Sequence, residues 1–263
     1  YELNMIIAGG TSSGKTALLN CLMPFIQPNH RIISIEDTRE LQLPEFLHWV
    51  PLTTREPNPE GKGEVTMLDL MINSLRMRPD RIIVGEIRRG DQAEVLFEAM
   101  HTGHSVYATL HADTVDQVIR RMTNPPIDIP EVMMEALHLV VVQYRDRRKG
   151  IRRTYQVAEI VPTGEKGTLK TNLLYRCRPD GKIVSHDKCV RIFDALNMHT
   201  GMSEKEILND IIEKMKILDW IKQNKINTVN DVGKIMAIYY AEPDVVIDFA
   251  TKNKNSKKLL EMF

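Results

Sequence analysis

The stretch Asn4–Leu19, NMIIAGGTSSGKTALL, decides the fold of this chain. It holds the pattern G-x-x-x-x-G-K-[ST], from Gly9 to Thr16, between the apolar run Met5–Ala8 and a helix-forming run that begins at Lys15. Glycines allow backbone N–H groups to turn inward around a phosphate, and the N-terminus of the following helix adds its dipole. The stretch therefore predicts a strand, a phosphate-binding loop and a helix, with a simple Gly/Ser turn as the alternative.

The loop pattern also predicts which residues contact a nucleotide. Lys15 is expected to reach the β- and γ-phosphates, and the Thr16 hydroxyl to ligate Mg²⁺. The full set of expected phosphate-binding residues is Gly9, Gly10, Thr11, Ser12, Ser13, Gly14, Lys15, Thr16 and Ala17.

The composition sets limits on the function. Of the 263 residues, 43% are hydrophobic, which is enough for a sizeable core. Lys+Arg and Asp+Glu both total 35, so overall charge gives no case for binding nucleic acid or an anionic membrane. The three cysteines are far apart in the sequence, which favours a reducing compartment and no zinc site.

The chain carries no sign of a membrane span or a signal peptide. No apolar run approaches the ~20 residues that cross a bilayer, and no charged segment precedes an apolar one at the N-terminus. The first residue is Tyr1 rather than Met, and a predicted strand follows within a few residues. We therefore expect the chain to be a piece of a longer polypeptide.

Apolar β-type runs alternate with helix-periodic segments through roughly the first 145 residues, which predicts an α/β fold with a mostly parallel sheet. The expected strands are Met5–Ala8, Arg31–Ile35, His48–Leu52, Arg81–Val84, Ser105–Leu110 and Leu139–Tyr144. The expected helices are Lys15–Phe25, Thr66–Arg76, Gln92–Thr102, Val115–Met122 and Pro130–Leu137. We expect residues 1–150 to form this core.

A strand pair and a helical region are expected after the core. Residues 151–186 are predicted to pair Arg153–Pro162 with Leu169–Arg176 through a turn at Gly164 and Gly167. Residues 187–263 are predicted to form a helical subdomain, with capping boxes at Ser203 to Glu206 and Thr228 to Asp231. The KNKNSKK segment near its end is expected to be frayed.

The segment RIIVGEIRRGD supplies the first acidic residue that could act on the nucleotide. The strand Arg81–Val84 delivers Glu86 to its C-terminal end, the edge where ligands bind in open α/β sheets. Gly85 stands where an aspartate is usual, so Glu86 is expected to orient or deprotonate the attacking water. A surface carboxylate with no catalytic role is the alternative.

A second acidic segment, ISIEDTREL, ends the strand Arg31–Ile35. Glu36 and Asp37 are expected to lie close enough to hold a Mg²⁺-bound water, with Glu36 also a catalytic candidate. The expected metal residues are thus Thr16, Glu36, Asp37 and Glu86, partly through water. A helix-capping role for Asp37 or Thr38 is the alternative.

Two histidines flank the predicted strand in TGHSVYATLHAD. His104 and His111 stand about seven residues apart, so an extended chain separates them by more than about 20 Å. They cannot therefore share one metal through this strand. His111, at the C-terminal end, is the better site candidate, whereas His104 is equally well explained as a satisfied turn residue.

These four blocks, GGTSSGKT, IEDTRE, IIVGEIRRGD and TGHSVYATLHA, in this order, resemble the type II and type IV secretion ATPase family. The resemblance covers about residues 1–145. It implies a RecA-like core in a hexameric ring, with ATP and Mg²⁺ bound at each subunit interface. It also implies that Arg55 and Arg76 are directed at ATP phosphates, some across the subunit boundary, although a solvated surface arginine is the alternative at both positions.

The branch of the family is narrowed by a few residues. The chain lacks a four-cysteine zinc insertion, and IEDTREL has a threonine where type II and pilus-assembly members have proline. It is therefore similar to archaeal motility, archaeal pilus and conjugation-type ATPases. This resemblance implies a cytoplasmic motor, peripheral at the membrane face, that drives a filament or secretion machine through an inner-membrane platform protein.

The turn RDRRKGIRR, Arg145–Arg153, carries six basic residues against one acid. It could contact acidic lipid headgroups or a partner's acidic face, or be a solvated hairpin. Two other functions are weighed for the whole chain. One is a RecA-like nucleic-acid translocase, which the balanced charge disfavours; the other is an assembly module that binds nucleotide without turnover.

Overall fold

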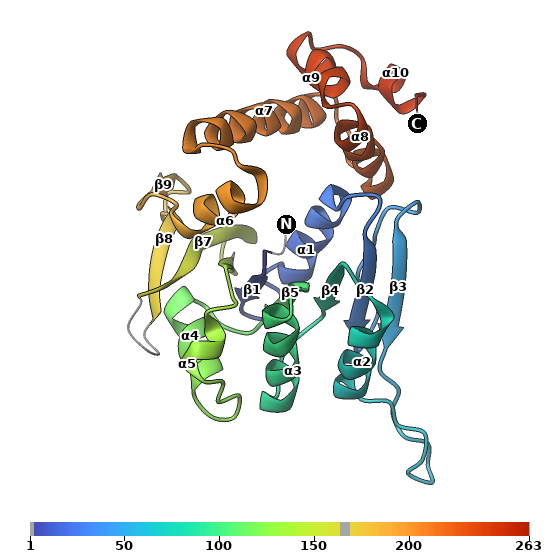
Figure 1. Ribbon diagram of the computed structural model, residues 1–263, viewed down its shortest axis with the longest axis vertical. Coiled ribbons are helices and arrows are strands. Elements are labelled where there is room, and N and C mark those ends of the chain that lie inside the picture. The colour runs from blue at the N-terminus through green and yellow to red at the C-terminus, as the bar shows by residue number, and fades with distance from the viewer. Residues whose placement is uncertain (1–2, 164–168, 263) are drawn as a thin grey trace. The chain divides into compact units, whose positions relative to one another are not determined.

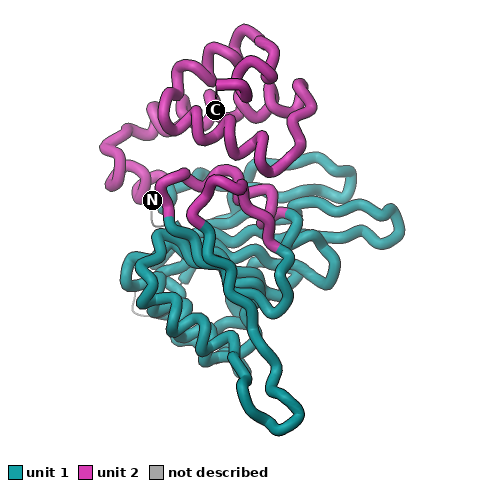
Figure 2. The backbone as a smooth tube through the Cα atoms, turned by 90° about the vertical axis from the view of Figure 1, so that its right-hand side faces the viewer, with its two compact units in different colours: residues 1–17, 31–40, 49–192 teal, residues 18–30, 41–48, 193–263 magenta. Residues whose placement is uncertain are grey.

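The computed structural model of this protein describes residues 3–163 and 169–262. The chain divides into two compact units (Figure 2). Unit 1 comprises residues 1–17, 31–40 and 49–192, and unit 2 comprises residues 18–30, 41–48 and 193–263. Helix α1 (Lys15–Leu22) belongs to both, because the division falls inside it.

Within the described residues, a nine-stranded sheet organises unit 1 in the order β3-β2-β4-β5-β1-β6-β7-β8-β9 (Figure 1). The strands are β1 (Met5–Gly9), β2 (Arg31–Glu36), β3 (His48–Thr53), β4 (Arg81–Val84), β5 (Ser105–Leu110), β6 (Leu139–Asp146), β7 (Ile151–Pro162), β8 (Leu169–Cys177) and β9 (Ile183–Ser185).

The middle of the sheet is parallel and one side of it is antiparallel. Strands β2, β4, β5, β1 and β6 pair in parallel, and β6 to β9 pair antiparallel. The carboxyl ends of β4, β5 and β1 therefore meet at one edge, which is the usual ligand edge of an open α/β sheet. The loops after these three strands carry Glu86, His111 and the phosphate-binding loop.

One face of the sheet is covered by helices α2 (Met67–Ser74), α3 (Gly90–His101), α4 (Val115–Thr123) and α5 (Glu131–Met134) (Figure 1). Alternate strand residues such as Ile33 and Ile35 belong to the same buried core as Phe97 of α3, all with no exposed surface. The predicted α/β fold with a mostly parallel sheet is confirmed.

Most predicted elements of unit 1 are found with small shifts at their ends. Thr66 and Asp69 form the predicted capping box of α2. The helix predicted over Lys15–Phe25 changes at Leu22 into the 3₁₀ turn η1 (Met23–Phe25), because Pro24 has no N–H for an α-helical hydrogen bond. A second 3₁₀ turn, η2 (Leu75–Met77), follows α2.

In unit 1 one predicted helix is shorter than expected, one strand was not predicted, and one predicted turn lies outside the described residues. The helix predicted over Pro130–Leu137 is only the four residues of α5, and β9 was not predicted. The predicted pairing of Arg153–Pro162 with Leu169–Arg176 is confirmed by β7 and β8. The turn predicted at Gly164 and Gly167 falls outside the described residues.

The described residues that follow β9 form helices, as predicted. Helix α6 (Arg191–Thr200) leads to α7 (Glu204–Gln223), α8 (Val229–Ala241), α9 (Pro243–Thr251) and α10 (Ser256–Leu260). The predicted capping box of α7 is confirmed, whereas at α8 the structure shows only the Thr228 side chain accepting from the Asp231 N–H. Among the described residues, no helix is long and apolar enough to cross a membrane.

Unit 2 has its own core, built around Trp220, Ile235 and Val246. Gly233 lets α8 approach the segment before β3, since a Cβ there would lie 2.5 Å from Pro44 Cγ. The Tyr240 hydroxyl donates to the Phe25 carbonyl at 2.6 Å, which ties α8 to η1. Unit 2 is therefore a packed helical body that includes two short segments from early in the chain.

The expectation of a frayed KNKNSKK segment is wrong. Asn255 caps helix α10 by accepting from the Lys257 N–H, and the Trp220 indole donates to the Lys254 carbonyl at 3.0 Å. Leu259 has no exposed surface. The Lys/Asn composition suggested an exposed chain end, but the Asn255 cap, the buried Leu259 and the partly buried Leu260 hold a short helix against the core of unit 2.

Candidate functional site

The phosphate-binding loop joins β1 to α1, as predicted, and its shape depends on glycine. Gly9 has φ +153° and Gly14 has φ +100°. A Cβ on Gly9 would lie 2.4 Å from Ser13 Oγ and 2.5 Å from the Gln143 carbonyl oxygen of β6. Any other residue at position 9 would therefore push the loop off the neighbouring strand.

Lys15, the first residue of α1, folds back over the loop. Its ammonium donates to the carbonyl oxygens of Gly9 at 2.9 Å and Gly10 at 3.2 Å, and lies 3.4 Å from His111 Nδ1. Burial lowers the pKa of Lys15 from its ordinary value, while the carboxylates of Glu86 and Asp113 act in the opposite direction. A partly desolvated cation held by uncharged acceptors is well suited to receive an anion.

His111 links Lys15 to Glu86. Its Nε2 lies 2.9 Å from Glu86 Oε1, while its Nδ1 faces the Lys15 ammonium. An ammonium can only donate, so Nδ1 accepts and the ring hydrogen lies on Nε2, directed at the carboxylate. The loops after β1, β5 and β4 thus converge on one line of contacts.

The position of Glu86 is set by backbone contacts between neighbouring strand ends. The Ile87 N–H donates to the Thr109 carbonyl at 3.0 Å, the Thr109 hydroxyl donates to the Gly85 carbonyl, and the Gly85 N–H donates to the Ile35 carbonyl at 2.8 Å. Glu86 itself is mostly buried, with its side chain 19% exposed. The sheet therefore fixes the carboxylate rather than leaving it free in solvent.

Arg88 extends the line to Asp37. Its Nε and Nη2 donate to Glu86 Oε2 at 2.9 and 2.8 Å, and its Nη1 donates to Asp37 Oδ2 at 2.7 Å. The hydrogen bond to Glu86 is the main reason that the pKa of Arg88 is raised. Asp37 also accepts from the Thr54 hydroxyl at 3.3 Å. The alternative of a helix cap at Asp37 or Thr38 is wrong, because no helix begins there.

Glu36 occupies a different place from Asp37. It is 4% exposed, and its Oε1 accepts from the Glu40 N–H at 3.0 Å. Its backbone carbonyl accepts from the Thr54 N–H, which joins β2 to the segment after β3. The hydrogen bond from Glu40 thus stabilises the turn after β2.

The two predicted arginines lie apart from this line of contacts. Arg55 is exposed and its Nε donates to the Gly63 carbonyl at 2.6 Å, across a short hairpin that begins after Thr54. Arg76 lies in η2, which precedes β4, whereas Glu86 follows β4. Arg76 is therefore placed near the opposite edge of the sheet from Glu86.

His104 lies away from the phosphate-binding loop, at the start of β5. His104 Nδ1 lies 3.2 Å from the Thr102 hydroxyl and 3.3 Å from the Ala99 carbonyl, in the turn before β5. In the part of the chain that the structure describes, no group of three or more His, Cys, Asp or Glu side chains could hold a metal ion.

Two residues that contact the site were not predicted. One is Arg88, which lies in the segment RIIVGEIRRGD. Its contact with Asp37 depends on the pairing of β2 with β4, which the local sequence does not indicate. The other is Arg152 of β7, whose Nε donates to the Ser12 carbonyl of the phosphate-binding loop at 2.8 Å. The basic turn Arg145–Arg153 was noted in the sequence, but its proximity to the loop follows from β6 pairing with both β1 and β7.

Comparison with known proteins gives the same family that the motifs indicate. The model of the family described as "Type II/IV secretion system protein" matches residues 1–179. The uncharacterised protein MJ1287 of Methanocaldococcus jannaschii is 36% identical over 238 residues, which cover 89% of this chain and 87% of that protein. The uncharacterised protein MJ0900 of the same organism is 44% identical over 91% of this chain, but only 44% of that protein is covered.

A solved structure that resembles part of the chain is the VirB11 ATPase of the Brucella suis type IV secretion system, crystallised with sulphate. It is 30% identical with a TM-score of 0.49, and the match covers 59% of this chain and 48% of that one. This chain thus spans less than half of several proteins that it matches. On the family model, which covers most of its length, the chain belongs to the type II/IV secretion system protein family.

Proposed function

We propose that this chain binds ATP with Mg²⁺ and hydrolyses it as one subunit of a ring-shaped motor. The observation that carries the proposal is the continuous contact from Lys15 through His111 to Glu86. A phosphate-binding lysine and a carboxylate able to orient water stand on either side of one imidazole, at the ligand edge of the sheet. That is the arrangement which attack of water on a terminal phosphate requires.

The residues present fit a triphosphate. The loop leaves the Ser13 hydroxyl buried without a hydrogen-bond partner, and Gly9 keeps the backbone open where a Cβ would collide. Lys15 can exchange its carbonyl acceptors for phosphate oxygens, and the negative charge then offsets the cost of its burial. Backbone N–H groups at the start of α1 supply the remaining donors.

Glu86 orients the attacking water and accepts its proton, while His111 and Arg88 hold the two carboxylate oxygens in place. Thr16, which follows Lys15 on α1, would hold Mg²⁺ together with water near Asp37. When bound, Mg²⁺ neutralises developing charge on the phosphate oxygens. We place Glu36 behind this site, as the residue that shapes the turn from which Asp37 projects.

The ring is supported by the position of the arginines. Arg76 lies near the opposite edge of the sheet from Glu86, so within one chain it is badly placed to reach the phosphates. A second copy that presents Arg76, or Arg55 from its exposed hairpin, would complete the site. Hydrolysis would then depend on the contact between subunits. This dependence would couple ATP hydrolysis to movement of one subunit relative to the next.

The work performed is proposed from family membership. Secretion and filament machines need a motor at the cytoplasmic face of the membrane, and movement of the ring would act on a membrane-embedded platform protein. Assembly or rotation of a pilus-like or archaellum-like filament is the output that the sequence features favour.

The test is steady-state ATP hydrolysis by mixed variants. Arg76→Ala and Glu86→Gln are each expected to be inactive alone, whereas a mixture should regain part of the activity, because some interfaces pair an intact Glu86 with an intact Arg76. A mixture of Lys15→Ala with Glu86→Gln is the matched control and should stay inactive, since both residues belong to the same chain's site. Absence of ATP turnover in the wild-type chain at every protein concentration would contradict the proposal.

A further inference from the structure

Helix α7 of unit 2 carries apolar side chains on two of its faces. One face contributes Ile217, Trp220 and Ile221 to the core of unit 2, where the Trp220 ring meets Phe249 of α9 with centroids 6.4 Å apart. A helix that packs on one side only is usually polar on the other. Here the second face carries a row of five side chains that are between 39% and 57% exposed, which are Leu208, Ile211, Ile212, Met215 and Leu218.

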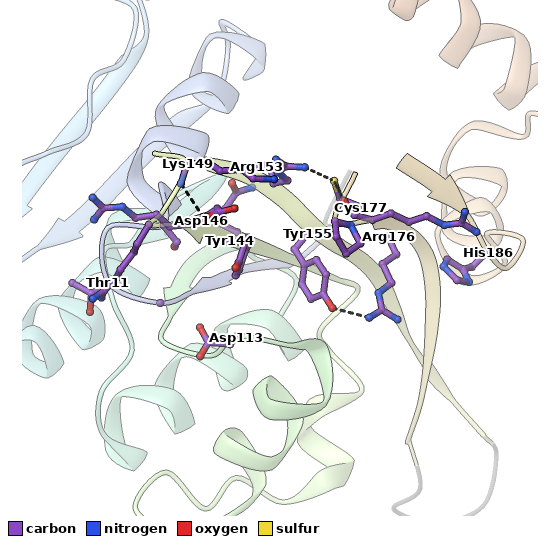
Figure 3. Close-up of a pocket in the computed structure, with 17 residues that line it drawn as sticks. Thr11, Asp113, Tyr144, Asp146, Lys149, Arg153, Tyr155, Arg176, Cys177 and His186 are labelled. Carbon is purple, nitrogen blue, oxygen red and sulfur yellow. Dashed lines mark hydrogen bonds between the residues drawn. The ribbon is translucent and has the colours of Figure 1, made fainter. Parts of the chain in front are cut away.

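The row on α7 lies apart from the cavity beside the phosphate-binding loop. That cavity has a volume of about 990 Å³, and Thr11, Asp113 and Tyr155 are among the residues that line it (Figure 3). All of its lining residues belong to unit 1, and the phosphate-binding loop forms one end of it. The cavity therefore belongs with the site described above, whereas the row on α7 has no part in that site.

A charged residue stands at each end of the row, and the two charges have opposite signs. Glu204 precedes Leu208 by four residues and Lys222 follows Leu218 by four, so both lie on the same side of α7 as the row. Glu204 and Lys222 are exposed. At 1.5 Å per residue, about 27 Å separates them along the helix axis. The row is thus an apolar strip with an acid at one end and a base at the other.

The apolar strip matches its own reversed copy. Leu208 and Leu218 stand five residues before and after position 213, and Ile211 and Met215 stand two residues before and after it. A second copy of α7, antiparallel and centred on position 213, would therefore set leucine against leucine and isoleucine against methionine along the row. A two-fold contact has this property, because the same patch serves both copies.

The charged ends select the antiparallel orientation. Glu204 and Lys222 stand nine residues before and after position 213, so the antiparallel pair brings each carboxylate to an ammonium of the other copy. A parallel pair would instead bring carboxylate to carboxylate and ammonium to ammonium, and like charges destabilise such contacts. Apolar register and charge thus favour the same arrangement.

We infer that the exposed row of α7 is a docking surface for a second copy of this chain, bound antiparallel about a two-fold axis. Five half-exposed side chains are far fewer than the roughly 20–30 residues per side of a standard interface, so the pairing is weak, with a Kd on the order of tens of micromolar. A two-fold contact closes after two copies and cannot build a ring. It is therefore separate from the proposed motor and would join two rings or two free chains.

The test is sedimentation equilibrium of the nucleotide-free chain between about 1 and about 300 µM, a range that brackets the expected Kd. Wild type should pass from monomer to dimer. Glu204→Lys and Lys222→Glu each make both charge pairs of the dimer repulsive, so each should weaken pairing at least about tenfold. An equimolar mixture of the two variants should pair again, because every charge pair in the mixed dimer then joins opposite signs.

Glu213→Lys is the matched control. Glu213 is exposed and lies about half a turn around α7 from the row, so this variant should pair as wild type does. Unchanged thermal unfolding of the variants separates a loss of pairing from a loss of folding.

Three results would overturn the inference and leave the proposed function untouched, since ATP takes no part in the experiment. The first is a chain that stays monomeric throughout the range, which would leave the row to unit 1 or to another protein. The second is association that the charge variants do not change, as assembly of a ring alone would give. The third is a mixture of the two variants that pairs no better than either one alone.

Discussion

Replacement of His111 tests whether the link between Lys15 and Glu86 matters for hydrolysis. His111→Ala removes the contact of 2.9 Å with Glu86 and the longer one of 3.4 Å with Lys15. Hydrogen bonds to charged groups contribute about 1.5–3 kcal/mol when well formed. Here the imidazole is 36% exposed and one contact is long, so we take about 1.4 kcal/mol, which corresponds to a tenfold loss in kcat.

We expect His111→Ala to lower kcat and to leave ATP affinity almost unchanged. Lys15 keeps its contacts with the loop carbonyls in His111→Ala, so ATP affinity should change less than about threefold while kcat falls about tenfold. His111→Gln can place an amide near the former Nε2 and should recover most of kcat. His111→Asn reaches only as far as the former Nδ1 and should not.

Steady-state hydrolysis, together with ATP binding measured by titration, separates these outcomes. His104→Ala is the control, since His104 flanks the other end of β5 and its ring lies against the Thr102 hydroxyl and the Ala99 carbonyl. Its kcat should equal that of wild type. An unchanged kcat in His111→Ala, or a loss of ATP affinity with kcat retained, would refute the reasoning that His111 positions Glu86.

Three further predictions concern the core of unit 2 and the phosphate-binding loop. Gly233→Ala should lower the free energy of unfolding by about 1–3 kcal/mol in thermal or urea unfolding, because the new Cβ would lie 2.5 Å from Pro44 Cγ; an unchanged midpoint would show that this contact relaxes freely. Burial raises the pKa of Tyr239 to about 12, so the phenol stabilises the fold below about pH 10 and this contribution is lost as pH rises toward about 12. Tyr239→Phe should therefore lose less stability than wild type between about pH 9 and about pH 11, and parallel curves would contradict it. Arg152→Ala should weaken ATP binding about fivefold by releasing the Ser12 carbonyl, and unchanged titration would show that the loop does not depend on this contact.

The sequence was sufficient to predict the parallel part of the sheet. Each of its strands is a short apolar run followed by a motif with its own chemistry, and buried parallel strands have this pattern because both faces are covered. The loop from Gly9 to Thr16 and the strand that ends before Glu86 were recognisable from local residues alone. The ends of these strands were predicted within two residues.

Contacts between distant segments could not be predicted in the same way. Arg88 meets Asp37 only because β2 and β4 are neighbours, and Arg152 meets Ser12 only because β6 lies between β1 and β7. Local patterns indicate which residues are charged but not which strand lies beside them. The same limit explains why Glu36 and Asp37, adjacent in sequence, have separate partners.

At the short helix α10 the local composition led to a wrong prediction. Its lysines and asparagines predicted a frayed end, whereas Leu259 is fully buried in unit 2. Composition averaged over several residues concealed the leucines, Leu259 and Leu260, that pack against the core of unit 2. A buried leucine contributes roughly 1.5–3 kcal/mol, which acts together with the Asn255 cap and the contact of Leu260 with the core of unit 2 to hold this five-residue helix.

The most direct test of the account is to measure ATP hydrolysis and ATP affinity of Glu86→Gln beside wild type. The account predicts that the amide keeps ATP affinity within about threefold, because Lys15 and the loop are intact, while hydrolysis falls by about 10²–10⁴-fold with the loss of the group that accepts the proton. Hydrolysis by Glu86→Gln at a rate close to that of wild type would contradict the central claim, since Glu86 would then not be the residue that acts on water.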